Sequence, residues 1–524
     1  MLTSNTLSFY EKTLGALFLV LSFQASAMAA TYYISPTGND NNTGTSETQP
    51  WKTFSKAFST MGGGNELILL DGNYSVEAGT GYISNTEAGS GQPPSGLSVS
   101  SPTYVHAKNP GNVTITGRML LGTSSTKKSY IKIQGITFEG GGALYNTSYV
   151  TIKDSGFHQS TQSSGSVFGI GTIDHNNGNT YNLIEDVWVW GNTRVIAINY
   201  RADYNVWRRV LVRGDGCSVS GCTGSGNPNV GLTVYNSSYV SVQNSMVVDR
   251  ILDGGEPYAN FAAAQHTPSQ NDQGVGEYLG PNVWLGCISL KSPDAGFYFE
   301  ADNVNDNTIT IRNSVAWDSR ASGFNMGTAT LKNIMLENLT SGLAANNGIR
   351  LATGVTGTVR NVVVYNASTY GINSAAQPTY SNVYGSGGSA YNQTTCSTGC
   401  KTTNPLADGT PPSIKYITRV ETGSSLESTG FNGGNYGANV VYRYGLDGTR
   451  YGETGYDTPT TTTLWPWPNE SRIKMELCAS SNRGFCLASS LSAYVWDILG
   501  NPMPSDIGGT TPMLSAPASL RIMN

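Results

Sequence analysis

Residues 240–247 read Val-Ser-Val-Gln-Asn-Ser-Met-Val, and residues 309–316 repeat the pattern as Ile-Thr-Ile-Arg-Asn-Ser-Val-Ala. In each stretch two apolar residues alternate with polar ones, a central Asn follows, and a second alternation begins with the opposite parity. Alternation with a period of two predicts a β-strand, and the change of parity predicts a sharp bend at the Asn. Each stretch is therefore expected to fold as two short strands joined at a corner.

The same pattern recurs throughout residues 131–385. A further short strand, led by a glycine, lies between the bends, so each repeat of roughly 20–30 residues holds three strands. One such unit cannot bury its own apolar face, and successive units must stack on one another. This favours a parallel solenoid over an antiparallel sandwich, which would need hairpin turns at every 8–12 residues or so. The expected bends are at Gly135, Asp154, Asp186, Arg209, Asn244, Gly286, Asn313, Asn333, Asn361 and Asn382.

The sequence resembles the right-handed parallel β-helix proteins of the pectate-lyase-like superfamily, exported bacterial members among them. The asparagines of the recurring bend look like that family's asparagine ladder, and residues 32–53 are similar to the start of many secreted β-helix proteins. The resemblance covers residues 31–400 and implies an all-β fold, a right-handed β-helix with three strands in each turn. It does not imply one activity, because this scaffold carries several chemistries.

The composition suits an exported solenoid. Of 524 residues only 12% are charged, against about 25% in an average soluble protein. The net charge of −5 and the absence of a basic run argue against nucleic-acid binding. An apolar stretch at residues 14–23, followed by small residues, predicts a signal peptide, and no later segment is expected to span a membrane. We therefore expect a secreted, periplasmic or cell-surface protein.

The seven cysteines fall into three close pairs and one single residue. In an exported chain such pairs favour small-loop disulfides over zinc half-sites, since no histidine lies near any of them. Cys287 is expected to be a buried apolar residue. The expected disulfide pairs are Cys217/Cys222, Cys396/Cys400 and Cys478/Cys486.

The chain divides into four expected segments. Residues 1–29 are the signal peptide, and residues 30–130 form an N-terminal cap and the first turns of the coil. Within this second segment, Phe54–Phe58 is expected to be a short amphipathic helix over the open end of the core. Residues 131–400 are the β-helix core. Residues 401–524 are a C-terminal β-rich segment with a helical tail, expected to close the far end of the solenoid.

Charged residues gather five positions beyond three successive bends. Asp249, Lys291 and Asp318 occupy this position, so neighbours are expected about 4.8 Å apart, and Arg250 and Arg320 flank them. In the family that the sequence resembles, this turn and the following strand form the wall of the sugar-binding cleft. These five residues are the candidate catalytic group. The alternative is a purely structural ladder, in which an Asp-Lys-Asp column avoids stacking like charges.

Further candidates lie on the glycine-led strands and in the longest interruption of the repeat, residues 251–281. The strands are expected to present substrate-binding side chains near the charged column. Trp188 has outward parity and is a candidate for stacking on sugar rings. A calcium ion could be held by Asp249, Asp253 and Asp318, although Lys291 at the centre opposes a cation. The expected substrate-binding residues are Tyr298, Glu300, Asn325 and Arg350.

Three functions are compatible with these residues, and the expected partner is a polysaccharide. A lyase acting on a uronate polymer would use Lys291 as base and the arginines to neutralise the carboxylate. An inverting glycoside hydrolase would pair Asp249 with Asp318, about 9.6 Å apart across two turns. A non-catalytic surface or matrix protein would bind glycan or serve as a rigid rod. The lyase is the leading hypothesis, and no oligomeric state is predicted.

Overall fold

The computed structural model describes residues 29–160, 165–171, 178–215, 230–251, 258–265, 281–301, 309–405 and 418–499, together with residues 503 and 507. The expected signal peptide, the Cys217/Cys222 pair and Asp253 lie outside the described residues. Within the described residues, the helices are all too short or too polar to cross a membrane.

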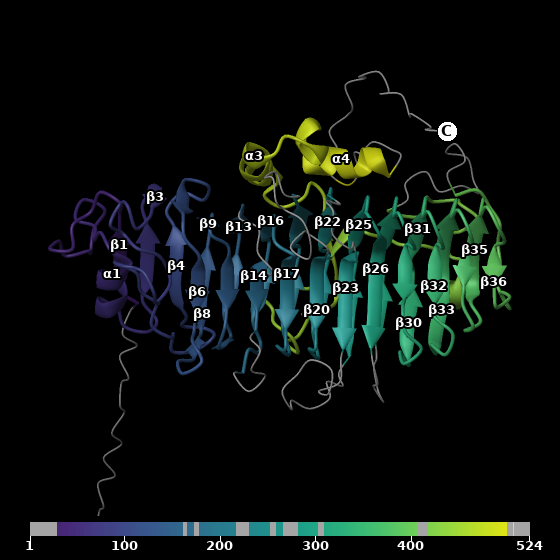
Figure 1. Ribbon diagram of the computed structural model, residues 1–524, viewed down its shortest axis with the longest axis horizontal. Helices are drawn as coiled ribbons and strands as arrows, with labels where there is room; N and C mark the ends of the chain where they lie inside the picture. Colours follow the sequence, from purple (N-terminus) through teal and green to yellow (C-terminus); the bar gives the residue numbers. More distant parts are fainter. Residues whose placement is uncertain are drawn as a thin grey trace, which may run out of the picture.

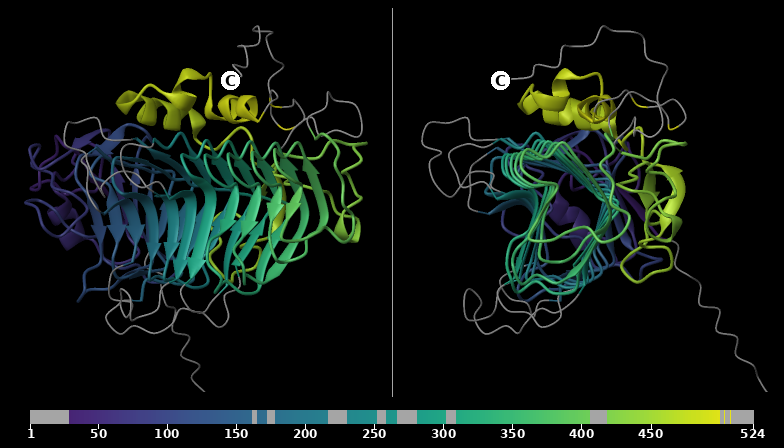
Figure 2. Two further views of the ribbon diagram at one scale, coloured as in Figure 1. Left: turned by 45° about the vertical axis from the view of Figure 1, so that its right-hand side comes forward. Right: turned by 90° about the vertical axis from the view of Figure 1, so that its right-hand side faces the viewer.

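The chain folds as a right-handed parallel β-helix, elongated along the coil axis (Figures 1 and 2). Each turn contributes up to three strands, which stack in parallel on the turns before and after it. We call the stacks the first, second and third columns, in the order in which a turn passes through them. The first two columns form one 23-stranded sheet that folds at the bends, and the third is an 11-stranded sheet. This confirms the fold expected from the repeat.

The columns contain all but four of the described strands. The first column consists of β1 (Thr31–Ile34), β2 (Glu66–Leu69), β4 (Thr103–Ala107), β8 (Ile131–Gln134), β12 (Thr151–Lys153), β15 (Leu183–Glu185), β18 (Val206–Arg208), β21 (Ser241–Gln243), β24 (Asn282–Leu285), β27 (Ile309–Arg312), β30 (Ile334–Glu337), β33 (Gly357–Tyr365) and β35 (Thr379–Tyr384), the last two of which continue into the second column. The second column consists of β3 (Gly72–Tyr74), β5 (Val113–Ile115), β9 (Thr137–Phe138), β13 (Gly156–Gln159), β16 (Trp188–Gly191), β19 (Leu211–Gly214), β22 (Met246–Val248), β25 (Ile288–Leu290), β28 (Val315–Trp317) and β31 (Thr340–Gly342). The third column consists of β6 (Met119–Leu121), β10 (Gly142–Leu144), β14 (Ser166–Ile170), β17 (Val195–Tyr200), β20 (Val230–Tyr235), β23 (Ala259–Gln265), β26 (Ala295–Ala301), β29 (Phe324–Met326), β32 (Ile349–Leu351), β34 (Ile372–Asn373) and β36 (Tyr391–Asn392).

The remaining elements lie outside the columns. They are the strands β7 (Lys128–Ser129), β11 (Thr147–Ser148), β37 (Tyr442–Tyr444) and β38 (Pro459–Thr463), the helices α1 (Phe54–Thr60), α3 (Glu470–Ser480) and α4 (Leu491–Ile498), and the 3-10 turns η2 (Phe431–Gly433) and η3 (Gly484–Leu487).

The bend between the first and second columns has left-handed backbone geometry, as a short polar residue at that position allows. The φ angle is 43° at Asn244, 49° at Asn313 and 54° at Asn361. Two expected bends were misplaced. The turn that contains β30 bends at Asn338 and not at Asn333, because Asn333 precedes the strand. The backbone amide of Asn338 bonds to a carbonyl of the next turn, as the amide of Asn313 does. In β35 the bend is at Tyr380, with φ of 48°, rather than Asn382.

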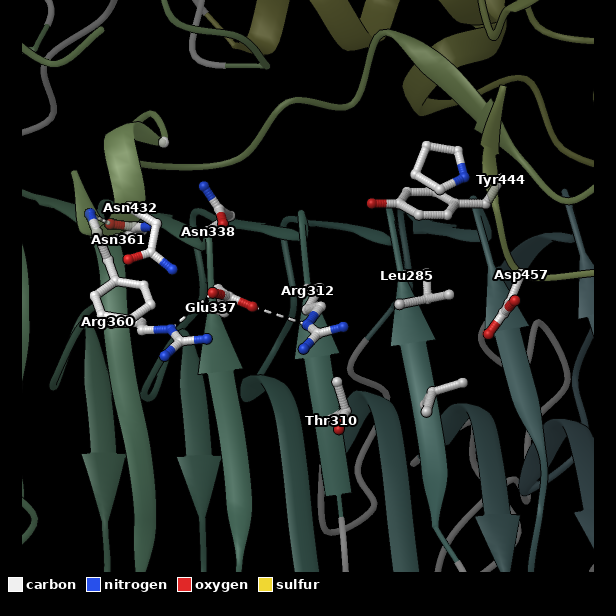
Figure 3. A pocket seen from close by; sticks show the side chains of 14 residues that line it. Leu285, Thr310, Arg312, Glu337, Asn338, Arg360, Asn361, Asn432, Tyr444 and Asp457 are labelled. Atoms are coloured by element: carbon white, nitrogen blue, oxygen red, sulfur yellow. Dashed lines mark hydrogen bonds and ion pairs between the residues drawn. The ribbon is translucent and has the colours of Figure 1, made fainter. Parts of the chain in front are cut away.

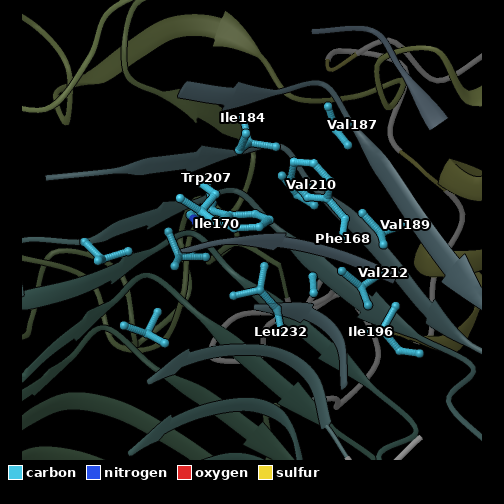
Figure 4. Close-up of a cluster of buried hydrophobic side chains, with 14 of the residues drawn as sticks. Phe168, Ile170, Ile184, Val187, Val189, Ile196, Trp207, Val210, Val212 and Leu232 are labelled. Atoms are coloured by element: carbon cyan, nitrogen blue, oxygen red, sulfur yellow. The ribbon is translucent and has the colours of Figure 1, made fainter. Parts of the chain in front are cut away.

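Inward-facing side chains of the three columns fill the coil with one continuous apolar core (Figure 4). Identical or similar side chains stack from turn to turn, as the rings of Phe261, Phe297 and Phe324 do at centroid distances of 4.8 and 4.7 Å. At the N-terminal end α1 buries Phe54 and Phe58 against this core, which confirms the expected helical cap.

The C-terminal module closes the flank of the β-helix and not its far end. An arm, residues 418–463, runs back along the bend between the first two columns. Asn361 Oδ1 accepts the Phe431 amide at 2.8 Å, and Asn338 Nδ2 donates to the Asn435 carbonyl at 2.8 Å. The helices α3 and α4 then lie over the outer face of the second column (Figures 1 and 2).

The apolar outer face of the second column explains why α3 and α4 lie over it. Its side chains are large and apolar, and exposing such a stripe to water would be unfavourable. Trp188 is fully buried, and its indole nitrogen donates to Glu476 Oε2 of α3 at 2.7 Å. The expected sugar-stacking role of Trp188 is therefore wrong, because a helix of the same chain covers the ring. The covered residues are Trp188, Trp190, Leu211, Met246, Ile288, Val315 and Trp317.

Candidate functional site

The corner between the second and third columns holds the charged column expected from the sequence. Asp249, Lys291 and Asp318 follow β22, β25 and β28, and their φ angles are 52°, 49° and 56°. The amide of Lys291 bonds to the Trp317 carbonyl at 2.9 Å, one position before Asp318. The three residues therefore occupy equivalent places on successive turns.

A cavity of about 430 Å³ opens at this corner. Three cationic side chains and one carboxylate line it, so the lining carries an excess of positive charge. Lys291, Asp318 and Arg320 are exposed, whereas Arg250 is only 4% exposed. The structure thus brings four of the five candidate catalytic residues around one space, which we call the corner cavity. It is lined by Arg250, Ile251, Lys291, Ser292, Pro293, Asp318 and Arg320.

Arg250 is held firmly at the base of the corner cavity. Its Nε donates to Asn260 Oδ1 at 3.1 Å, and its Nη2 lies 3.5 Å from Ser292 Oγ. Burial lowers the pKa of the guanidinium to about 9, although the negative charge of Asp294 opposes this shift. Because 9 is above neutral pH, Arg250 carries a fixed positive charge that can face an anion in the cavity.

Asp249 faces away from the cavity towards the C-terminal helices. Its Oδ2 accepts the backbone amide of Phe485 at 2.9 Å, and its Oδ1 accepts the hydroxyl of Tyr494. Arg483 also donates to the Asp249 carbonyl. The Asp249 side chain is therefore an attachment point for η3 and α4. The expectation that it joins the other four candidate catalytic residues is corrected, because Asp249 does not line the corner cavity.

Tyr494 of α4 is a member of the corner that the sequence did not reveal. Its ring lies beneath Lys291, with the ammonium nitrogen 5.5 Å from the ring centroid. Burial, and after it the negative charge of Asp249, raises the pKa of the Tyr494 hydroxyl above its ordinary value. Tyr494 therefore stays neutral and donates a hydrogen bond to Asp249.

The four expected substrate-binding residues lie together on the outer face of the third column. Tyr298, Asn325 and Arg350 are in register on β26, β29 and β32. Arg350 Nη1 donates to Asn325 Oδ1 at 2.8 Å, and the Tyr298 hydroxyl donates to Glu300 Oε2 at 3.2 Å. The ring of Tyr258 packs edge-on against Tyr298 at 4.5 Å. None of these residues lines the corner cavity.

The calcium site expected at Asp249, Asp253 and Asp318 does not fit the side chains that the structure describes. Both carboxylate oxygens of Asp249 are already bonded, and Lys291 stands between Asp249 and Asp318. Throughout the described ranges, no three His, Cys, Asp or Glu side chains are grouped closely enough to hold a metal ion.

Two of the expected disulfides are confirmed, Cys396–Cys400 and Cys478–Cys486. The second joins α3 to η3, directly beside the contact that η3 makes with Asp249. Cys287 is a free, fully buried thiol, as expected, and burial raises its pKa to about 12.

Replacing Tyr494 by Phe is expected to destabilise the protein by about 1–3 kcal/mol, because a buried oxygen of Asp249 loses its donor. Urea unfolding of the two proteins measures this difference. Tyr442→Phe is the matched control, since Tyr442 is 42% exposed and should tolerate the change. Equal stability of the Tyr494 and Tyr442 variants would contradict the attachment of α4 through Asp249.

One family model matches the chain, over residues 36–83, and is described as a protein of unknown function (DUF1565). No curated protein sequence matches. Among solved structures, the pectate lyase Pel9A is similar at 17% identity, with a TM-score of 0.43, covering 78% of this chain and 95% of that one. The A-module of the mannuronan C-5 epimerase AlgE6 from Azotobacter vinelandii is similar at 12% identity, with a TM-score of 0.41, covering 67% and 93%.

A rhamnogalacturonan lyase is similar at 17% identity, with a TM-score of 0.33, over 64% of this chain and 82% of that one. At these identities a likeness concerns the fold alone. The parallel strand register, the left-handed bends and the helical cap are features of the chain itself. They show that the chain is a right-handed parallel β-helix protein.

Proposed function

We propose that the chain is an exported carbohydrate-active protein that binds a uronate-containing polysaccharide at the corner cavity and cleaves it by β-elimination. The observation that carries the proposal is the meeting of Arg250, Lys291 and Arg320 around one cavity of about 430 Å³. In a chain with only 12% charged residues, three cations around one space favour an anionic ligand.

The cavity residues suit the steps of an elimination. Arg250 and Arg320 would neutralise the sugar carboxylate and stabilise the negative charge that develops beside it. Lys291 Nζ would be the general base that accepts the proton from the carbon next to the carboxylate. The electron pair of that C–H bond forms the new C=C bond, and the glycosidic C–O bond to the next sugar breaks. The leaving oxygen takes a proton from water, and the hydroxide that remains takes the proton from Lys291, which restores the base.

Hydrolysis by Asp249 and Asp318 is less well supported. An inverting enzyme needs one carboxyl group to protonate the leaving oxygen and a second to activate water. Asp249 is bonded to Tyr494 and Phe485 and does not line the cavity. Asp318 alone cannot supply both roles.

The test is to incubate the purified protein with a panel of polyuronates and with neutral polysaccharides as controls. Elimination produces an unsaturated uronate, which absorbs in the ultraviolet, whereas hydrolysis produces new reducing ends without that absorbance. We expect the absorbance to rise with at least one polyuronate. Reducing ends alone would replace the lyase by a hydrolase. Binding without either product would indicate a non-catalytic glycan-binding protein instead of a lyase. If the protein shows no binding and no product, the proposal is refuted.

A further inference from the structure

A second cavity, of about 560 Å³, lies between the first column and the C-terminal arm (Figure 3). We call it the arm groove. Its floor carries Arg312, Glu337 and Arg360 from β27, β30 and β33, and its other side carries Phe431 and Tyr444 from the arm. Its volume is within the range of about 300–1,000 Å³ that is usual for small-molecule sites.

The floor of the arm groove is a row of three charges in register on successive turns. Glu337 accepts Arg360 Nε at 2.7 Å on one oxygen and meets Arg312 Nε at 2.9 Å on the other. Both arginines are therefore held through Nε. In the part of the chain that the structure describes, neither Nη group of Arg360 has a hydrogen-bond acceptor. Arg312 is 44% exposed, and its Nη2 contacts only the sulfur of Met335 within the same described part.

An aromatic ring stands at each end of the row. The Arg360 guanidinium lies over the Phe431 ring, 4.1 Å from its centroid. At the other end, Tyr444 is fixed by its amide, which donates to Asn244 Oδ1 at 2.5 Å, and by its hydroxyl, which meets Asn313. Tyr444 is only 7% exposed, whereas Phe431 is partly exposed beside the Nη groups of Arg360. A sugar presents both apolar faces and hydroxyl groups to a protein, and this end of the row can contact both.

The charges of the arm groove cancel. Arg312 and Arg360 are balanced by Glu337 and Asp457. Thr310 and three asparagine side chains also line the space and add both donors and acceptors. The corner cavity, by contrast, holds three cations against one carboxylate. A polyanion gains nothing from a lining without net charge, whereas a ligand rich in hydroxyl groups can use the donors and acceptors together.

We propose that the arm groove is a second carbohydrate-binding site and that it takes a neutral oligosaccharide. The guanidinium Nη groups of Arg312 and Arg360 donate to sugar hydroxyls, and Phe431 contacts a sugar face. The site does not depend on the corner cavity, because no residue lines both. It would hold the protein on a neutral glycan whatever reaction the corner cavity performs.

The experiment is isothermal titration of the full chain with short neutral oligosaccharides of glucose, xylose, mannose and galactose, and with oligogalacturonate as the acidic probe. We expect one of the neutral probes to bind, and Arg312→Ala to weaken the binding of that probe while leaving the binding of oligogalacturonate unchanged, because the corner cavity is intact in the variant. Arg312→Ala should weaken the neutral binding about 10-fold or more, because hydrogen bonds from a charged donor are lost. Lys108→Ala is the matched control, since Lys108 is 42% exposed and also pairs with a carboxylate.

Arg312→Ala is expected to fold, because nearly half of the side chain is exposed, and an unchanged thermal midpoint verifies this. Phe431→Ala gives an independent reading of the aromatic end and should also weaken binding. Three results would overturn the inference. They are no binding of any neutral probe, binding of oligogalacturonate that Arg312→Ala weakens as much as it weakens neutral binding, or neutral binding that neither Arg312→Ala nor Phe431→Ala changes.

Discussion

Replacing Lys291 by Ala is expected to lower the rate of uronate elimination by about 10²–10⁴-fold, the usual contribution of a positioned general base. Lys291 is exposed at the centre of the corner cavity, and Arg250, Arg320 and Asp318 line the same space. The proposed reaction uses no other described side chain of this cavity to accept the proton. The measurement is the initial rate of ultraviolet absorbance with the best polyuronate from the panel.

Substrate binding separates this loss from a loss of structure. Arg250 and Arg320 remain in the Lys291→Ala protein, so its affinity for oligouronate should fall far less than its rate. Lys108→Ala removes an exposed cation outside the cavity and should keep the full rate. A Lys291→Ala protein that retains the wild-type rate would exclude Lys291 as the base, even if the protein proves to be a lyase.

Replacing Glu185 by Ala is expected to lower the free energy of unfolding by about 3–5 kcal/mol, because it leaves buried charges without their partner. Glu185 is fully buried, and it meets Arg208 Nη1 at 2.7 Å and Lys153 Nζ at 2.6 Å. Its Oε2 also accepts the amide of Gly448 in the C-terminal arm at 3.0 Å. Urea unfolding measures the loss, and limited proteolysis should show earlier cleavage in the arm.

The same carboxylate predicts how stability depends on pH. Burial would raise the pKa of Glu185, but Arg209, Lys153 and Arg208 outweigh it and hold the pKa at about 2. The folded value is below the ordinary one, so the contribution is present in full above the ordinary pKa and is lost as the pH falls towards 2. Glu185→Gln should therefore differ most from wild type near neutral pH. A difference independent of pH would contradict this assignment.

Much of the fold could be predicted because its rules are local. Alternation of period two and a change of parity at Asn244 and Asn313 describe a bend that each turn makes with its own residues. Asp249, Lys291 and Asp318 could be aligned for the same reason, since each follows its bend by five positions. Asn333 was mistaken for a bend because residues 331–333, Leu-Lys-Asn, and residues 336–338, Leu-Glu-Asn, both match the pattern that precedes a bend. In the structure both asparagines have left-handed geometry, and only Asn338 follows β30.

The parts that sequence could not show depend on contacts between distant segments. Tyr494 meets Asp249 across a separation of 245 residues, and Glu476 meets Trp188 across 288. Nothing in the repeat around Trp188 indicates that a helix covers it. The apolar outer face of the second column was the available signal, since a solenoid wall with several large apolar residues needs a cover.

The arm groove was missed for the same reason. Arg312, Glu337 and Arg360 lie on a repeat whose charges suggest only an ion-paired surface. The groove exists because the arm brings Phe431 and Tyr444 against that surface.

The most direct test of the corner cavity is a crystal structure of the Lys291→Ala protein soaked with an oligouronate. We predict that a sugar carboxylate lies within hydrogen-bonding distance of the guanidinium groups of Arg250 and Arg320, with the adjacent carbon facing position 291. An oligouronate bound only on another face, with the corner cavity free of sugar, would contradict the account.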